Sequence, residues 1–353
     1  MRIRYPAVAI AAVVLLVSFS IFVIIGWPDE RTVAFVDDFT FVLLSSTTAV
    51  FAGQAARTAE GRTRAAWIAM TVGLVCTSIG DMIWTGYEVM GHEIPVPSLA
   101  DVGYLLFPVF ACIALMLFWH GEGGRDSGLV IADGVIVAGS LFMMSWLLVL
   151  MPVESALESD GLERVVLLAY PVSALIVLTV AAVTLVRVGA GQRFTASLLA
   201  LGMALTALSD NVFSFLMAHG RYMSGSVTDI GYMANLLLIL FAAVEGFRPG
   251  QTRTSTLSLP GWASIWLPFS PMLVAVALAA FGPVESLRTG PILVAGLAIG
   301  IAILVRQYLV VRETRQLLAA AAERAMRDPL TGLANRILFH DRLEQALWRR
   351  HGD

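Results

Sequence analysis

The sequence Ser98-Leu99-Ala100-Asp101-Val102-Gly103-Tyr104 returns, at a shift of 128 residues (98 to 226), as Ser226-Val227-Thr228-Asp229-Ile230-Gly231-Tyr232. Upstream, the pair Gly80-Asp81 has its counterpart in Ser209-Asp210, at a shift of 129 residues (81 to 210). A residue pattern that recurs at one offset indicates an internal structural repeat. The sequence therefore predicts two copies of one unit, which fixes the architecture of most of the chain.

The composition is that of a membrane protein. Of the 353 residues, 58% are hydrophobic and only 14% are charged, whereas about a quarter of a soluble protein is charged. Apolar segments of around 20 residues recur along the chain, and each is long enough to cross a hydrocarbon core of ~30 Å as a helix. A net charge of −3 offers no basic surface, so no nucleic-acid partner is expected. We expect an all-α polytopic protein whose first partner is membrane lipid.

About ten membrane spans are predicted. The first apolar run is longer than the core of a secretory signal and lacks a small-residue cleavage site, so it is interpreted as an uncleaved span. The predicted spans cover residues 6–26, 39–57, 65–90, 98–119, 128–151, 162–187, 194–218, 227–247, 261–281 and 290–311. Four spans fall in repeat 1 (1–127), four in repeat 2 (128–253) and two in an extra hairpin (254–311). Because each repeat has an even number of spans, the prediction is a parallel 4+4 repeat.

Arginine placement predicts the orientation. In the short loops, ten arginines lie on one side of the predicted membrane and four on the other. Basic residues gather in cytoplasmic loops, so the first side, which carries both ends of the chain, is predicted to be cytoplasmic. The ten are Arg2, Arg4, Arg57, Arg62, Arg64, Arg125, Arg187, Arg193, Arg248 and Arg253; the four are Arg31, Arg164, Arg221 and Arg288.

A stretch that favours helix follows the tenth span, at residues 312–327. Nothing breaks it before Pro329, and as a helix it would reach about 24 Å into the cytoplasm. Val311, Leu318, Ala322 and Ala325 form a short apolar seam on it. That seam fits either a dimerising helix or an ordinary linker.

The residues after this helix form a motif with fixed spacing. Pro329 presets φ for a turn, Gly332 can take a positive φ, and Asp328 and Asn335 can bond nearby backbone amides. The motif consists of Asp328, Pro329, Leu330, Thr331, Gly332, Leu333, Asn335 and Arg336. It resembles the D-x-L-T-G-L-x-N-R opening of the GGDEF domain of diguanylate cyclases, bacterial enzymes that condense two GTP into cyclic di-GMP. The resemblance covers only residues 324–353, and Ile337 stands where the family often has a second arginine.

The resemblance implies a bacterial inner-membrane protein with a cytoplasmic cyclase output. Residues 328–353 would supply only the first turn and helix of the α/β GGDEF domain, and no G-G-[DE]-E-F signature occurs in the sequence. No catalytic residue and no cofactor is therefore assigned here; Mg²⁺ and GTP are implied only for a complete cyclase domain. In the family, product forms when two such domains face each other, so a homodimer through the 312–327 helix and the output domain is expected.

Four carboxylates are predicted to gather near the outer face of the membrane. Asp81 and Asp210 lie deep in outward-going spans, where an acid is costly and needs a partner or a role. The Ser-x-x-Asp spacing at Asp101 and Asp229 is typical of capping boxes at helix starts. These acids either pair across helices or line an outer polar pocket for a cation or small polar molecule. The pocket residues would be Asp81, Asp101, Tyr104, Asp210, Asp229 and Tyr232; no metal site is predicted, and Asp133 is expected to pair with Arg187 or Arg193.

Two functions from different classes fit these patterns. The first is a sensory module that regulates the cyclase. The second is a transporter or channel, because parallel repeats with intramembrane acids are also found in transporters. A non-catalytic tail that only binds partners is a third possibility.

Overall fold

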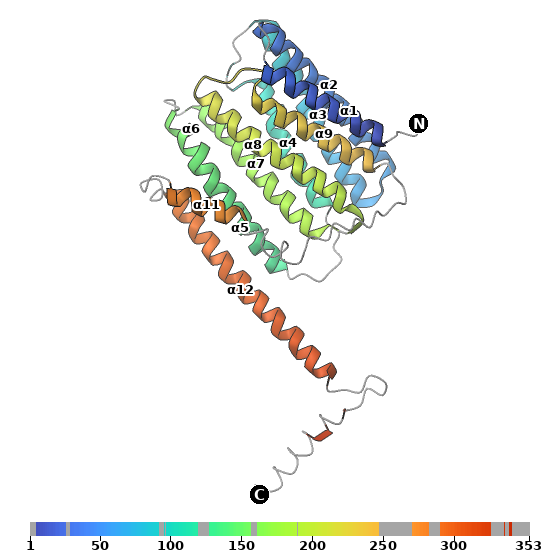
Figure 1. Cartoon of the computed structure of the whole chain (residues 1–353), viewed down its shortest axis with the longest axis vertical. Coiled ribbons are helices and arrows are strands. Elements are labelled where there is room, and N and C mark those ends of the chain that lie inside the picture. Colours follow the sequence, from blue (N-terminus) through green and yellow to red (C-terminus); the bar gives the residue numbers. More distant parts are fainter. Residues whose placement is uncertain are drawn as a thin grey trace.

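The computed structural model describes residues 5–25, 29–91, 95, 97–118, 127–156, 161–188, 190–246, 270–281, 290–325, 335 and 339–340. Within these residues the chain is helical and contains no strand, which confirms the all-α class (Figure 1). The helices of the first half are α1 (Tyr5–Ile25), α2 (Glu30–Thr58), α3 (Gly61–Val89) and α4 (Leu99–Leu117), followed by α5 (Ser127–Ser145), the π-helical turn η1 (Trp146–Leu150) and α6 (Met151–Ala156). The second half contains α7 (Leu162–Arg187), the 3-10 turn η2 (Ala190–Gln192), α8 (Arg193–Ala218), α9 (Val227–Gly246), α11 (Ser270–Phe281) and α12 (Gly290–Ala325).

Eight helices of the described chain are long and apolar enough to cross a membrane, which indicates a membrane protein. Of the ten predicted spans, eight correspond to helices of this kind. The first predicted span corresponds to α1, whose apolar stretch Ile10–Ile25 is shorter than the other eight. Residues 261–269 of the ninth predicted span lie outside the described residues, and its remainder corresponds to α11, of 12 residues.

Six helices close into a ring. Each helix packs against the next in the order α2, α3, α4, α7, α8 and α9, and α9 packs against α2. The predicted repeat shift relates α2 to α7, α3 to α8 and α4 to α9, so the contacts α4–α7 and α9–α2 are counterparts of each other. The two copies therefore meet head to tail around a common centre. In Figure 1 these helices form the upper body of the molecule.

Small residues let neighbouring helices of the ring approach closely. A Cβ added to Gly103 of α4 would lie 2.5 Å from the Cys76 carbonyl oxygen and 3.1 Å from the backbone of Gly80, both on α3. In the second repeat, a Cβ on Gly231 of α9 would lie 2.1 Å from the Ser209 Oγ of α8. Close backbone approach at small residues is a usual source of helix association in membranes. The glycine of the repeated sequence is thus a packing residue in both copies.

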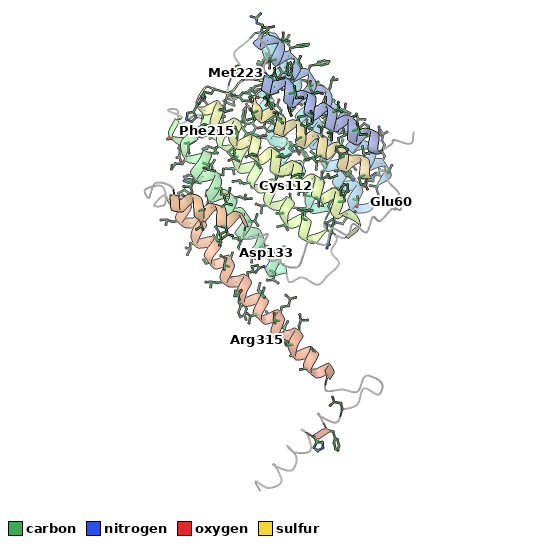
Figure 2. The ribbon with its side chains drawn as sticks, in the orientation of Figure 1. Glu60, Cys112, Asp133, Phe215, Met223 and Arg315 are labelled. Carbon is green, nitrogen blue, oxygen red and sulfur yellow. The ribbon has the colours of Figure 1, made fainter. Side chains whose placement is uncertain are left out.

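Helix α12 joins the body through α5. Gly139 of α5 faces Ile299 of α12, and the Arg306 Nε donates to the Asp133 Oδ1 over 2.6 Å. The prediction that Asp133 pairs with Arg187 or Arg193 was therefore wrong: α12 comes back along α5, a contact that local spacing does not reveal. Figure 2 shows Asp133 at this junction and Arg315 farther along α12, where the helix projects away from the body.

The predicted span 290–311 and residues 312–325 of the predicted helix after it form one continuous helix, α12. Most of the turn motif, Asp328 to Ala334 and Arg336, lies outside the described residues. Asn335 is described, and its carbonyl oxygen accepts the Phe339 N–H over 2.9 Å. The resemblance of this segment to a GGDEF domain stays a prediction.

Candidate functional site: a carboxylate pocket inside the helix ring

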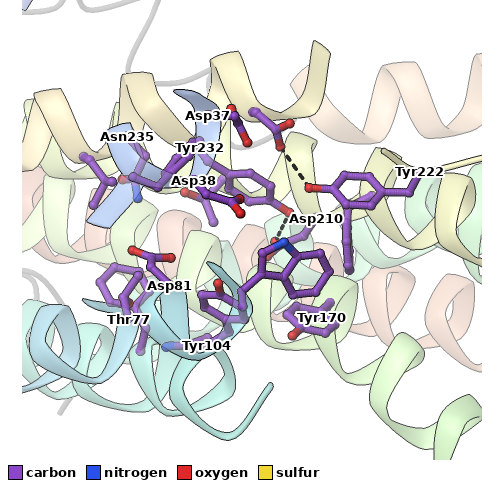
Figure 3. Close-up of a pocket in the computed structure, with 18 of the residues that line it drawn as sticks. Asp37, Asp38, Thr77, Asp81, Tyr104, Tyr170, Asp210, Tyr222, Tyr232 and Asn235 are labelled. Carbon is purple, nitrogen blue, oxygen red and sulfur yellow. Dashed lines mark hydrogen bonds between the residues drawn. The ribbon is translucent and has the colours of Figure 1, made fainter. Parts of the chain in front are cut away.

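A pocket with a cavity volume of about 160 Å³ lies inside the ring. All six ring helices line it, together with Tyr222 from the connection between α8 and α9. The lining residues come from the N-terminal halves of α2, α4, α7 and α9 and from the C-terminal halves of α3 and α8. Because these helices alternate in direction, the pocket lies toward one end of the ring. Figure 3 shows the labelled aspartates and tyrosines around this common space.

The structure places five of the six predicted pocket residues in the lining: Asp81, Tyr104, Asp210, Asp229 and Tyr232. Asp101 does not line the pocket. Its Oδ1 accepts a hydrogen bond from the hydroxyl of Tyr170, which does. The tyrosine of the repeated sequence and the acid of the preceding helix thus line the pocket in both copies.

Asp81 and Asp210 have tyrosine neighbours at equivalent positions. The Tyr232 hydroxyl donates to the Asp210 Oδ1 over 2.7 Å, linking α9 to α8. In the first repeat, Tyr104 and Ser45 lie within hydrogen-bonding reach of the Asp81 carboxylate. Pairing across helices with Tyr232, one of the partners that the sequence suggested for Asp210, is therefore present.

Asp101 and Asp229 cap their helices and also face tyrosines. The Ser98 backbone N–H donates to the Asp101 Oδ2 over 2.5 Å, and the Ser226 N–H donates to the Asp229 Oδ2 over 2.7 Å. The capping box is thus confirmed at the start of α4, and the half of it made by the acid is present at the start of α9. The second oxygen of each acid accepts a tyrosine hydroxyl, from Tyr170 in one case and from Tyr222, over 3.3 Å, in the other.

Two acids of the pocket, Asp37 and Asp38, were not predicted. The predicted span began at residue 39, which left both in an outer loop, whereas α2 begins at Glu30 and carries them into the ring. The signal was the N-cap Asp29, whose carboxylate accepts the Thr32 hydroxyl over 2.5 Å, an interaction that lowers the pKa of Asp29. An Asx residue three positions before a threonine can mark a helix start earlier than hydropathy does.

Several acceptors of the pocket lack a hydrogen-bond partner. Asp37, Asp38 and Asp81 are 3%, 5% and 7% exposed. The Asp37 Oδ1, the Asp38 Oδ2 and the Asp81 Oδ2 are buried and receive no hydrogen bond from the described residues. Buried polar groups are normally paired, so a group of unpaired ones in one pocket calls for an explanation. A bound ligand that donates hydrogen bonds is one.

Aromatic rings form much of the rest of the wall. The Phe213 and Tyr222 rings meet edge to face at 4.8 Å, and the Tyr222 ring also meets that of Trp84 at 6.1 Å. Tyr170 packs on the other side of Phe213 at 5.4 Å. Burial, together with the nearby Asp229, raises the pKa of Tyr222 well above its ordinary value, so this phenol stays a neutral donor. The pocket therefore joins carboxylates to aromatic faces.

The titratable side chains of the pocket lining are acids and phenols. Five of its described lining residues are aspartates and none is an arginine, a lysine or a histidine. Within the described chain, no three His, Cys, Asp or Glu side chains are arranged as a metal site. An acidic lining of this kind is suited to a positively charged molecule.

Comparisons with known proteins identify no family for this chain. No family model, curated protein or solved structure matches the chain.

Proposed function

We propose that this chain is the membrane sensory and transducing part of a bacterial inner-membrane protein that regulates a cytoplasmic diguanylate cyclase. In this proposal the pocket receives the signal, and α12 transmits it to the cyclase domain that begins at Asp328. Mg²⁺ and GTP would belong to the complete cyclase domain. The support consists of the motif, the pocket and the continuity of α12.

The single observation that carries the proposal is the length of α12. Its 36 residues make a helix about 54 Å long, whereas the hydrocarbon core is about 30 Å thick. A helix that extends out of the membrane without a break can transmit a movement of the bundle directly to a domain outside it. Beyond Arg306, most of α12 is exposed, including Leu317 and Leu318 at 64% and 65%. These side chains support contact with a second copy of the chain, and hence a homodimer.

The topology supports an external pocket with both chain ends in the cytoplasm. The lining residues lie toward the end of the ring where α2 begins, and α12 runs antiparallel to α5, away from that end. Figure 1 shows α12 leaving the body at the opposite end. GTP is cytoplasmic, and the arginine-rich loops favour the same side. Signal and output would then lie on opposite faces of the membrane.

Helix α5 is the proposed connection between the pocket and α12. The Ser145 Oγ, at the start of the π-helical turn η1, donates to the Asn211 Oδ1 of α8 over 2.7 Å. Asn211 follows the pocket residue Asp210, and Asp133 at the other end of α5 holds Arg306. π-turns inside α-helices are frequent at functional sites. A shift of α8 on ligand binding could reach α12 by this route.

The experiment measures cyclic di-GMP in cells that produce the native gene product. An immunoblot of native membranes against residues 312–325 should show a band well above the 37.9 kDa of this sequence. Deletion of the gene region encoding 5–246 should change the cyclic di-GMP level while the cyclase remains. A band at 37.9 kDa, or an unchanged nucleotide level, would contradict the regulatory proposal.

The alternative is a transporter or channel, favoured by a pocket enclosed between two parallel repeats. The position of the pocket toward one end of the ring, away from the middle, counts against it. Uptake of a labelled small cation into liposomes that contain the chain would support transport. Binding without uptake would support the sensor.

A further inference from the structure

We propose that the pocket binds a small primary ammonium compound, with its charged nitrogen among the aspartates and its apolar body against the aromatic rings. The inference rests on the proposed sensory function, for which this amine would be the signal. It goes further by naming the chemical class of the ligand.

The first step is charge. Asp37 and Asp38 are adjacent on α2, and Asp81, Asp210 and Asp229 share the same cavity. Carboxylates gathered in a buried space repel each other unless protons or a cation neutralise them. No basic side chain is among the described lining residues, so the neutralising proton or cation has to come from outside the pocket, and a bound cation is the alternative tested below.

The second step is the kind of hydrogen bond on offer. The unpaired atoms Asp37 Oδ1, Asp38 Oδ2 and Asp81 Oδ2 are carboxylate oxygens, which accept hydrogen bonds when ionised. A primary ammonium group carries three N–H donors and a positive charge. A quaternary ammonium has the charge without the donors, and an alcohol has one donor without the charge. A primary ammonium supplies both needs in a compact group.

The third step is the wall. Trp84, Tyr104, Tyr170, Phe213, Tyr222 and Tyr232 all line the cavity. Aromatic faces attract a cation within about 6 Å and also shelter the carbon atoms attached to it. They supply few of the six or more oxygen ligands that a Ca²⁺ or Mg²⁺ ion needs. The wall thus offers the carbon atoms of an organic cation contacts that a bare metal ion does not use.

The fourth step is size. A cavity of about 160 Å³ is close to an engineered protein cavity of about 150 Å³ that binds benzene. A six-carbon ring or short chain with one ammonium group fits this volume. Cyclohexylamine is a suitable probe, and cyclohexanol is its neutral counterpart of nearly equal shape.

The test is calorimetric titration of the purified chain in lipid nanodiscs, with empty nanodiscs subtracted. Cyclohexylamine should bind at least about tenfold more tightly than cyclohexanol, and Asp81→Asn and Asp37→Asn should each weaken its binding about tenfold or more, since one charge-assisted hydrogen bond is lost. Glu60→Gln is the matched control, because Glu60 is exposed at the opposite end of α3, and it should leave the affinity unchanged.

Equal binding of the amine and the alcohol would overturn the proposal and show an apolar cavity only. Binding of Mg²⁺ or Na⁺ in place of the amine, or no binding at all, would overturn it as well. The comparison of the two probes uses the native chain, so it decides even where a variant fails to fold. The readout contains no cyclase activity: lack of amine binding leaves the cyclase proposal standing, and an unregulated cyclase leaves the binding result standing.

Discussion

Replacing Asp133 by asparagine should loosen α12 from the rest of the bundle. The Arg306 Nε lies 2.6 Å from the Asp133 Oδ1, and the two side chains are only 14% and 16% exposed. The amide keeps the shape of the carboxylate and removes its charge, so the Arg306 guanidinium loses the ionic part of this contact between two helices. Breaking one partner of a fully buried pair costs about 3–5 kcal/mol. Since this pair keeps some solvent contact, we expect a loss of about 2–4 kcal/mol.

The chain offers a matched control in Glu154→Gln. Glu154 pairs with Arg164, but these side chains are 41% and 28% exposed. An exposed pair contributes about 0–1 kcal/mol, so the same acid-to-amide change should cost little there.

The assay is unfolding in mixed detergent micelles followed by circular dichroism. A double-mutant cycle with Arg306→Gln isolates the interaction, and the double variant should be more stable than the sum of the single losses predicts. If Asp133→Asn costs no more than Glu154→Gln, or if the two losses simply add, the pair does not hold α12 and α5 is not the connection to the output helix.

Two further changes test the ring itself by thermal unfolding. Gly103→Ala should cost about 1–3 kcal/mol, because its new methyl group would lie 2.5 Å from a carbonyl oxygen of α3. Gly86→Ala, with no atom within 4 Å of the new methyl, should be neutral or stabilise by up to about 1 kcal/mol, and equal losses at both glycines would refute the close approach. Tyr232→Phe removes the 2.7 Å hydrogen bond to Asp210 and should cost about 1–3 kcal/mol. Tyr308→Phe, at a residue 66% exposed on α12, should cost almost nothing; a similar loss at both tyrosines would show that the Asp210 bond adds no stability.

The helical class was accessible from the sequence. An apolar run long enough to cross a membrane leaves the backbone no alternative to a helix or a closed barrel, so composition decides the class. Each fixed residue of the repeated Ser-x-x-Asp-x-Gly-Tyr pattern has its own structural role. Its serine and acid cap a helix, its glycine allows close packing, and its tyrosine reaches the acid of the preceding helix.

The long-range arrangement was not accessible in the same way. The pairing of Asp133 with Arg306 joins residues 173 positions apart, and no periodicity relates them. Asp37 and Asp38 were missed because hydropathy places a span where residues are apolar, and these two acids belong to a helix that continues into a polar pocket. Polar residues inside a bundle lower the hydropathy of the surrounding segment, and hydropathy is the signal by which its helices are located.

The most direct test of the account is helical insertion into α12 between residues 320 and 321 of the native gene product, with cyclic di-GMP as the readout. At about 100° per residue, two added alanines turn the output by about 200°, whereas seven add nearly two full turns and restore its direction. If α12 transmits the state of the ring to the cyclase, the two-residue insertion should disrupt the regulation that deletion of 5–246 also removes, and the seven-residue insertion should retain it. Identical cyclic di-GMP responses from both insertions and the native protein would contradict the account.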